Sequence, residues 1–428
     1  MDDQSRQNTN LALTDLMTNM ARKARLGAEA LRLAGPEVRT TAILEAAKSI
    51  RAREAQILAA NLEDQKFARD KGLTEAMIER LILNPARVEA MAKGLEEVAA
   101  LADPVGRELA RWTRPNGLDI ARVSTPIGVI AIIYESRPNV TADAAALCIR
   151  SSNAAILRTG SEALNSALAI YAAFEDGFRA AGLPDSCVQL VPTSDRDAVG
   201  LILGGLDKTI NLIIPRGGKS LVARVQAEAR APVLAHLEGL NHTYIHADAD
   251  AEKAVAVTLN AKMRRVSVCG ATETLLIDAA VAPDLLPKIA TALEAAGCEL
   301  RGDVMSQKLH PMTAATEEDW RTEYSLAIIS IKVVDDIQAA IDHIRTYGSG
   351  HTEAIITENA EAAETFLNAV DSAIVIWNAS TQYADGGEFG FGAEIGISTD
   401  RLHARGPVGV DQLTTFKYVV RGHGQTRP

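Results

Sequence analysis

Hydrophobic positions recur every three or four residues through roughly the first quarter of the chain. The stretches "LTDLMTNMARKARLGAEALRLAG" and "AILEAAKSIRAREAQILAANLED" both keep this spacing. It predicts amphipathic helices up to about residue 105. The next segment, "RELARWTRPNGLDIARVSTP", alternates on both sides of Pro115-Asn116-Gly117. That pattern predicts a β-hairpin.

From residue 128 the pattern changes, because continuous apolar runs now alternate with helical periods. The runs expected to form strands are "GVIAIIYES", "AAILRTG", "CVQLVP", "TINLIIPR" and "APVLAHL". Strands that are apolar on both faces are typical of a parallel sheet covered by helices on both sides. Right-handed crossovers between such strands give a doubly wound sheet.

A second series of the same kind begins near residue 251. Its expected strands are "ETLLIDA", "LAIISIKVV", "HTEAIIT" and "SAIVIWN", again with helical segments between them. The chain ends with "DQLTTFKYVVRGHG", an extended strand with no helix after it. We therefore predict an α/β protein with two doubly wound βα domains and a small additional β element. Because exposed strand edges are usually covered, we expect the hairpin and the last strand to pair between subunits.

Composition narrows the class of protein. The 428 residues carry a formal net charge of −11, which disfavours general binding to nucleic acid. No apolar run reaches the ~18 residues of a membrane span. The start, "MDDQSRQNTN", is too polar for a secretory signal. The four cysteines are widely spaced, which disfavours a disulfide framework or a zinc ribbon and favours a cytoplasmic protein.

One of the four cysteines differs from the rest. Cys148, Cys187 and Cys298 lie on or beside apolar segments, where inert buried thiols are usual. Cys269 lies in "RRVSVCGATET", an expected loop, with Gly270 beside it. Three basic residues come shortly before it: Lys262, Arg264 and Arg265. Small neighbours give access and cations favour the thiolate, so Cys269 is a candidate nucleophile. The alternative is one more buried cysteine.

Three histidines lie close together in "HLEGLNHTYIH". They are His236, His242 and His246, and three histidines suggest zinc. Their spacing matches no metal-binding motif, however, so ordinary polar histidines are the favoured interpretation.

The glycine pair in "LIIPRGGKSL" is placed like a nucleotide-binding loop between a strand and a helix. The ATP-type motif needs a glycine at position 213, where the chain has Ile. An anion site remains possible at the helix start, with charge from Arg216 or Lys219. The alternative is a plain surface turn.

Two further strand ends carry polar residues, and open α/β sheets bind ligands at such ends. In "YESRPNVT", Asn139 is a candidate donor to a developing oxyanion, or simply a helix N-cap. In "LRTGSEA", Arg158 and Ser161 are candidates to hold a ribose or its phosphate, or simply begin a helix.

Taken in order, these features resemble the aldehyde dehydrogenase superfamily. Within it, the segments "YESRPNVT", "YGSGHTEAIIT" and "NASTQYADGGEFGFGAEIGISTDRLHARGPVGVDQLTTFKYVVRG" look like the gamma-glutamyl phosphate reductases. The resemblance extends over nearly the whole chain. It implies reduction of L-glutamate 5-phosphate to glutamate 5-semialdehyde with NADPH, through a cysteine thioester, in proline biosynthesis.

The resemblance also implies roles for individual residues. Cys269 corresponds to the nucleophile and Asn139 to the oxyanion donor. Glu323, in "TEY", matches the acidic position near the nicotinamide ribose. The other implied cofactor-binding residues are Arg158, Ser161, Pro215, Arg216, Gly217, Gly218, Lys219 and Ser220. The charge of Arg158 favours NADPH over NADH.

The implied organisation has three parts. Residues 1–107 and 126–240 form the NADP-binding domain, and residues 241–400 form the catalytic domain. Residues 108–125 and 401–428 form the oligomerisation element, which implies a homodimer or a higher homo-oligomer. No nucleic acid, membrane or metal is implied.

Two departures from the superfamily leave alternatives open. Residues 263–267, before the Cys-x-x-x-Glu-Thr core, differ from the family pattern. We expect them to change the shape of the pocket edge and therefore the contacts with the substrate. Where hydrolytic aldehyde dehydrogenases carry a general base in E-L-G-G-K, this chain has His236, with Glu238 two residues on. If the segment is a strand, Glu238 points to the opposite side. A hydrolytic aldehyde dehydrogenase and a non-catalytic binding protein remain the alternatives.

Overall fold

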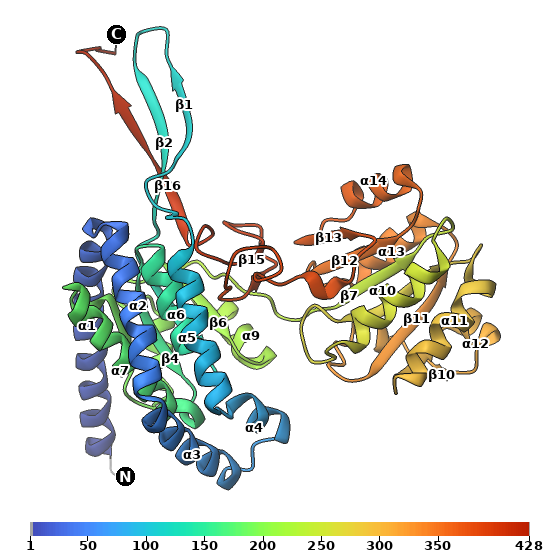
Figure 1. The fold of residues 1–428 in the computed structure, drawn as a ribbon, viewed down its shortest axis with the longest axis horizontal. Helices are drawn as coiled ribbons and strands as arrows, with labels where there is room; N and C mark the ends of the chain where they lie inside the picture. Colours follow the sequence, from blue (N-terminus) through green and yellow to red (C-terminus); the bar gives the residue numbers. More distant parts are fainter. Residues whose placement is uncertain (1–2, 428) are drawn as a thin grey trace. The chain divides into compact units, whose positions relative to one another are not determined.

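The computed structural model describes residues 3–427 and divides into two compact units (Figure 1). The first unit runs to Ala235 and includes Gly390–Gly396 and the chain from Val408 onward. The second contains His236–Phe389 and Ile397–Pro407. The hairpin and the last strand count with the first unit, so the division differs from the expected one near the C-terminus.

The first unit starts with helices, as the periodicity predicts. Its helical elements are α1 (Asp3–Leu33), α2 (Pro36–Ala52), α3 (Glu54–Asp70), α4 (Glu75–Leu81), α5 (Pro85–Ala100), α6 (Val140–Arg150), η1 (Ser161–Ala163), α7 (Leu164–Ala181), η2 (Asp185–Cys187), α8 (Asp197–Leu203) and α9 (Lys219–Glu228). Pro36 and Pro85 lie in the first turns of α2 and α5, where a missing N–H costs nothing.

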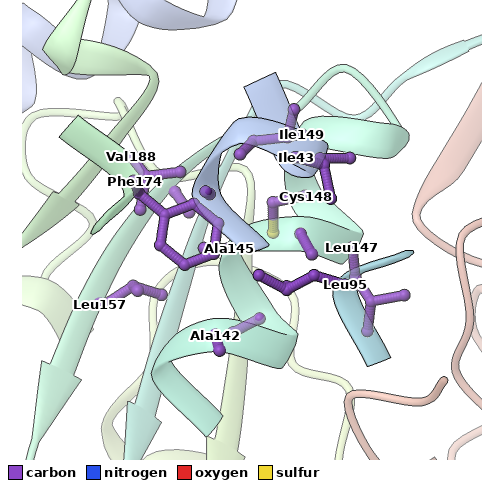
Figure 2. Close-up of a cluster of buried hydrophobic side chains, with 14 of the residues drawn as sticks. Ile43, Leu95, Ala142, Ala145, Leu147, Cys148, Ile149, Leu157, Phe174 and Val188 are labelled. Atoms are coloured by element: carbon purple, nitrogen blue, oxygen red, sulfur yellow. The ribbon is translucent and has the colours of Figure 1, made fainter. Parts of the chain in front are cut away.

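A four-stranded parallel sheet lies among these helices. Its strands are β3 (Val129–Tyr134), β4 (Ala154–Thr159), β5 (Val188–Leu190) and β6 (Leu212–Arg216), in the order β5-β4-β3-β6. Successive residues of β3 enter opposite cores. Ile132 packs with the cluster of Figure 2, which includes Leu95, Cys148 and Phe174, whereas Ile133 packs on the α1 side. The doubly wound arrangement is confirmed.

The expected hairpin consists of β1 (Glu108–Thr113) and β2 (Asp119–Pro126), with Gly117 at φ +85° in its turn. The terminal strand β16 (Thr414–Arg421) pairs antiparallel with β2 along eight residues of the same chain. The hairpin and the last strand therefore pair with each other within one chain, and the expected pairing of this sheet with another subunit stays a prediction. The chain reaches β2 through buried Leu413, whose carbonyl accepts a bond from Asn153.

The second unit is the other βα series. Its helical elements are α10 (Ala251–Met263), α11 (Ala282–Ala295), α12 (Val304–Leu309), η3 (Asp319–Arg321), α13 (Ile337–Tyr347), α14 (Ala360–Ala369) and η4 (Thr381–Tyr383). Its strands are β7 (Asn241–Ile245), β8 (Thr272–Asp278), β9 (Glu299–Gly302), β10 (Thr313–Ala314), β11 (Ile328–Val334), β12 (Thr352–Ile356), β13 (Ile374–Trp377), β14 (Ile397–Ser398) and β15 (Gly406–Pro407).

Seven of those strands form one parallel sheet, in the order β10-β9-β11-β8-β7-β12-β13. Along β8, Leu275 and Ile277 pack with α10 and α11, whereas Leu276 packs with α13 and α14. The short strands β9 and β10 were not expected, because "ELRG" and "TA" carry too little apolar pattern.

One expected strand is wrong. Residues 231–237, "APVLAHL", form a single bridge between Val233 and Ile213 and are otherwise irregular. Pro232 interrupts the run, since proline has no N–H to donate to a ladder. Among the described residues, no helix is long and apolar enough to cross a membrane.

Candidate active site

Three polar loops meet at one edge of the first unit's sheet. Tyr134, the last residue of β3, is in register with Thr159 of β4 and with Arg216 of β6. The loops that follow these residues therefore start side by side. The chain turns to opposite sides of β3 to form β4 and β6, which makes this edge the switch point of the sheet.

The glycine loop after β6 binds a carboxylate of its own chain. The backbone N–H of Gly218, at the start of α9, donates to Glu135 Oε2 at 3.1 Å. A Cβ on Gly217 would lie 2.5 Å from the same oxygen, so a larger residue there would displace this carboxylate. Glu135 follows β3 directly. An internal carboxylate therefore lies at this helix start, where an anion is favoured.

Arg158 lies at the end of β4, as expected, but the residue is only 7% exposed. It donates to the carbonyls of Thr159, Ser194 and Asp195. Burial lowers its pKa, although Glu162 opposes that shift. Most donors of Arg158 are therefore used inside the fold.

Ser161 begins η1 and accepts a hydrogen bond from the exposed Lys71 Nζ at 3.0 Å. Lys71 follows α3, far away in the sequence, and its ammonium is the accessible positive charge beside Ser161. The neighbouring Glu162 accepts from both the N–H and the hydroxyl of Ser136. A cation and a hydroxyl therefore lie together at the end of β4.

Asn139 occupies the N-cap position of α6, but its side chain makes no capping bond. Its exposed amide Nδ2 donates instead to Asp143 Oδ2 at 3.0 Å. Burial raises the pKa of Asp143 to about 6. The simple capping role is thus excluded for the side chain, and Asn139 presents an amide at the same sheet edge.

The loop before β8 carries Cys269, which is only partly buried. Asn241, fully buried at the start of β7, fixes this loop through hydrogen bonds to its backbone. Its Nδ2 donates to Cys269 O at 2.6 Å and to Ala271 O at 2.8 Å, while its Oδ1 accepts from Thr352 N at 3.1 Å. A Cβ on Gly239 would lie 2.0 Å from Cys269 O, so the two backbones are in close contact. The nucleophile candidate therefore lies on a fixed loop.

Two histidines lie beside this cysteine. One ligand atom each of His236, Cys269 and His351 lies within 4.8 Å of the others. The two imidazole rings meet edge to face, with centroids 5.1 Å apart. His236 Nδ1 contacts Ile397 O, and His351 Nδ1 contacts Thr352 Oγ1, both at 2.8 Å.

The three other cysteines are buried, as predicted. Burial raises the pKa of Cys148 and of Cys187 to about 12 and that of Cys298 to about 11. Figure 2 shows Cys148 enclosed by apolar side chains. These thiols are chemically inert at neutral pH, which leaves Cys269 as the accessible one.

Lys262, one of the basic residues expected near Cys269, forms a buried ion pair instead. Lys262 is fully buried and donates to Glu273 Oε2 at 2.5 Å. Glu273 is the glutamate of the Cys-x-x-x-Glu-Thr core, and burial raises its pKa. Ser325 N contacts the other oxygen of Glu273, so the loop that carries Glu323 lies beside the start of β8. Lys262 is therefore committed to an ion pair with Glu273, and its expected effect on the Cys269 thiolate stays a prediction.

Comparison with known proteins now decides the family. The model of the aldehyde dehydrogenase family matches residues 7–301. The gamma-glutamyl phosphate reductase of Caulobacter sp. (strain K31) is 65% identical over 419 residues, which cover 98% of this chain and 100% of the relative. The chain belongs to the gamma-glutamyl phosphate reductases of the aldehyde dehydrogenase family. The resemblance seen in the sequence is confirmed.

Two more relatives agree with this membership. The gamma-glutamyl phosphate reductase of Caulobacter vibrioides is 66% identical over 413 residues, covering 96% of this chain and 100% of the relative. The crystal structure of the Thermotoga maritima gamma-glutamyl phosphate reductase is 44% identical, with a TM-score of 0.94, and covers 96% of this chain and all of its own. The fold class of this reductase family is the one expected for this chain.

The structure gathers the sequence-predicted residues into two sets. The strand-end residues of the first unit share one sheet edge, namely Asn139, Arg158, Ser161, Pro215, Arg216, Gly217, Gly218, Lys219 and Ser220. Cys269 and Glu323 both lie at the start of β8 in the second unit. Roles that need both sets are proposals, treated below.

Sequence reasoning missed four residues of these sites. Glu135 had a detectable signal, because an acid directly after a strand and beside a glycine loop is a candidate partner for the loop. Lys71, Asn241 and His351 carry no local signal, since long-range packing alone brings them to the sites.

Glu238 lies outside any strand. Residues 236–240 are irregular, so alternation along a strand does not decide where Glu238 points. His236, at the position where hydrolytic relatives are expected to carry glutamate, is the residue that lies beside Cys269.

Proposed function

We propose that this chain reduces L-glutamate 5-phosphate to L-glutamate 5-semialdehyde and phosphate, with NADPH as reductant. High identity to gamma-glutamyl phosphate reductases over nearly the full length carries the proposal. The partly buried Cys269, beside two imidazoles, supports it. The substrate is an acyl phosphate, whose carbonyl carbon is open to attack by a thiolate.

The reaction begins with the sulfur of Cys269. Its thiolate attacks the acyl carbon, the carbon–oxygen bond to phosphate breaks, and a thioester forms on the enzyme. The thiol proton leaves to the solvent before the attack, and Cys269 is only partly buried, so its sulfur is open to the substrate. Because Asn241 fixes the loop, the sulfur keeps its position when the substrate arrives.

The developing negative charge on the carbonyl oxygen needs donors. We infer that the Asn139 amide and the backbone N–H of Cys269 provide them. Asn139 is exposed and bonded to Asp143, so its amide is oriented before substrate binds.

NADPH, when bound, supplies the hydride that converts the acyl group to the aldehyde. Its pyrophosphate fits the glycine loop at α9, which already binds the Glu135 carboxylate. Because two anions cannot share that loop, we infer that Glu135 competes with the pyrophosphate. Its adenosine ribose fits the end of β4, near Ser161.

We further infer that Lys71, rather than Arg158, meets the 2′-phosphate that distinguishes NADPH from NADH. Lys71 is exposed and bonded to Ser161, whereas Nη1 and Nη2 of Arg158 donate to backbone carbonyls. Arg158 then holds the loop at 194–195 in place. For Glu323 we keep the role implied by the family resemblance, a contact to the nicotinamide ribose.

The three-stranded sheet supports assembly into a homo-oligomer. One face of this sheet carries large apolar side chains, at 39–57% exposure: Trp112, Phe416, Tyr418 and Val420. Trp112 and Tyr418 contact each other on this face. Such a patch is usual at contacts between subunits. Replacing both rings by Ser should yield monomers in light scattering, and a wild-type monomer at micromolar concentration would refute the proposal.

The function is tested in the reverse direction by following NADPH formation from glutamate semialdehyde and NADP⁺. We expect turnover only when phosphate, or arsenate in its place, is present, because water lacks a general base equivalent to the hydrolytic glutamate. Cys269→Ser is the control for the thioester, because turnover through it should be lost when the sulfur is replaced. Sustained turnover without either anion would point to a hydrolytic aldehyde dehydrogenase instead.

A further inference from the structure

Cys269, His236 and His351 form a cluster that the reduction reaction does not require in full. The three residues come from different segments: the irregular stretch before β7, the loop before β8, and the residue before β12. One donor atom of each lies within 4.8 Å of the other two. A thiol and two imidazoles are the ligand types that borderline-soft metal ions prefer.

The surroundings of both histidines match those of metal ligands. Histidines that bind metal usually engage the second ring nitrogen with a carbonyl, a carboxylate or a hydroxyl, which fixes the tautomer. His236 Nδ1 contacts the carbonyl of Ile397, and His351 Nδ1 contacts the hydroxyl of Thr352. His351 Nε2 is buried and has no hydrogen-bond partner among residues 3–427. An unsatisfied buried nitrogen of this kind is costly unless something binds it.

The distances between the three donor atoms also suit a Zn²⁺ ion. In a tetrahedral zinc site with bonds of 2.0–2.3 Å, donor atoms lie roughly 3.3–3.6 Å apart. Donors within 4.8 Å therefore need to close by at most about 1.5 Å, which side-chain rotation of the partly buried Cys269 and His236 can provide. The fourth position stays open to water, as in zinc sites with three protein ligands.

We propose that Cys269, His236 and His351 bind one Zn²⁺ ion, which blocks the enzyme reversibly. Binding releases the thiol proton to the solvent and leaves sulfur as a metal-bound thiolate, so its lone pair no longer attacks the acyl phosphate. The inhibition rests on the function proposed above, whereas binding of the ion does not. The same cluster thus makes the nucleophile sensitive to free zinc.

The test measures zinc binding directly. The full chain is stripped with a chelator, desalted, and titrated with Zn²⁺ against a chromophoric chelator. We expect one ion per chain, and a loss of affinity of at least about tenfold in Cys269→Ser and in His351→Asn. Thr352→Val removes the hydroxyl that supports His351 and should weaken binding by about 10–100-fold while retaining the side-chain volume. His246→Asn, in the same unit but outside the cluster, is the matched control and should bind normally.

Co²⁺ provides an independent readout, because a cysteine ligand gives a thiolate-to-cobalt absorption band that Cys269→Ser should abolish. The proposal is overturned if wild type binds Zn²⁺ no more tightly than Cys269→Ser, or if no thiolate band forms. Zinc binding without any reductase activity would refute the proposed function and leave the metal site standing. If the chain shows reductase activity but does not bind zinc and is not inhibited by it, the metal site is refuted and the proposed function stands.

Discussion

Replacing Asn241 by Ala should uncouple the nucleophile loop from the sheet. The substitution removes two bonds that this buried amide donates, to Cys269 O at 2.6 Å and Ala271 O at 2.8 Å, and one that it accepts from Thr352 N at 3.1 Å. Each buried polar group left unpaired costs about 1–3 kcal/mol. If water re-pairs one or two of these three groups, we expect a loss of about 1–6 kcal/mol in the free energy of unfolding.

For turnover, the displacement of the Cys269 sulfur should matter more than the loss of stability. A displacement of roughly 1 Å at a reacting atom lowers turnover by about 10²-fold, so we expect a fall of about 10–100-fold in kcat at temperatures where the variant is folded. Alkylation of Cys269 by iodoacetamide reports the loop directly, because the other three cysteines are buried and unreactive.

Asn153→Ala is the matched control. Asn153 is also fully buried, donates to Leu413 O at 2.8 Å and accepts from Gly128 N at 2.8 Å, but it lies in the first unit. It should lose comparable stability in urea denaturation while keeping the alkylation rate of Cys269. If Asn241→Ala loses stability yet alkylates and turns over like wild type, Asn241 does not position the nucleophile.

Four other outcomes are expected. Cys269→Ser should lower turnover by at least about 10³-fold with cofactor binding retained, measured by NADPH fluorescence; appreciable activity would exclude the thioester. Lys71→Ala should weaken NADPH binding by about tenfold and leave NADH binding unchanged, whereas Arg158→Ala should affect both cofactors equally; the reverse pattern would restore Arg158 as the 2′-phosphate contact. Glu135→Gln should tighten NADPH binding by about fivefold, and weaker binding would contradict the competition. Burial lowers the pKa of His343 to about 2. Its folded pKa is below the unfolded value of 6.5, so its stabilisation is complete above pH 6.5 and is lost below it, by about 1.4 kcal/mol per pH unit. His343→Leu should flatten this fall in urea denaturation, and an unchanged slope would contradict it.

Local pattern was enough to identify most of the fold and many of the candidate residues. Helix and strand periods depend on neighbouring residues, and they located the helical N-terminal region, the hairpin and the principal strands of both βα series. The period failed at residues 231–237, where Pro232 prevents a ladder, and at the short β9 and β10. Parallel strands bring their carboxyl ends to one edge, so the loops at Asn139, Arg158 and Gly217 could be grouped from the sequence.

What each of these side chains does was decided by contacts between distant parts of the chain. The sequence shows that Arg158 ends a strand, but the tertiary structure commits its guanidinium to carbonyls and brings Lys71 to Ser161. Likewise, the sequence favoured ordinary polar histidines for His236 and its sequence neighbours, whereas folding places His236 with His351 and Cys269. Hydrogen bonds and metal-type clusters depend on ångström distances between side chains, and periodicity along the chain determines which elements form without fixing those distances.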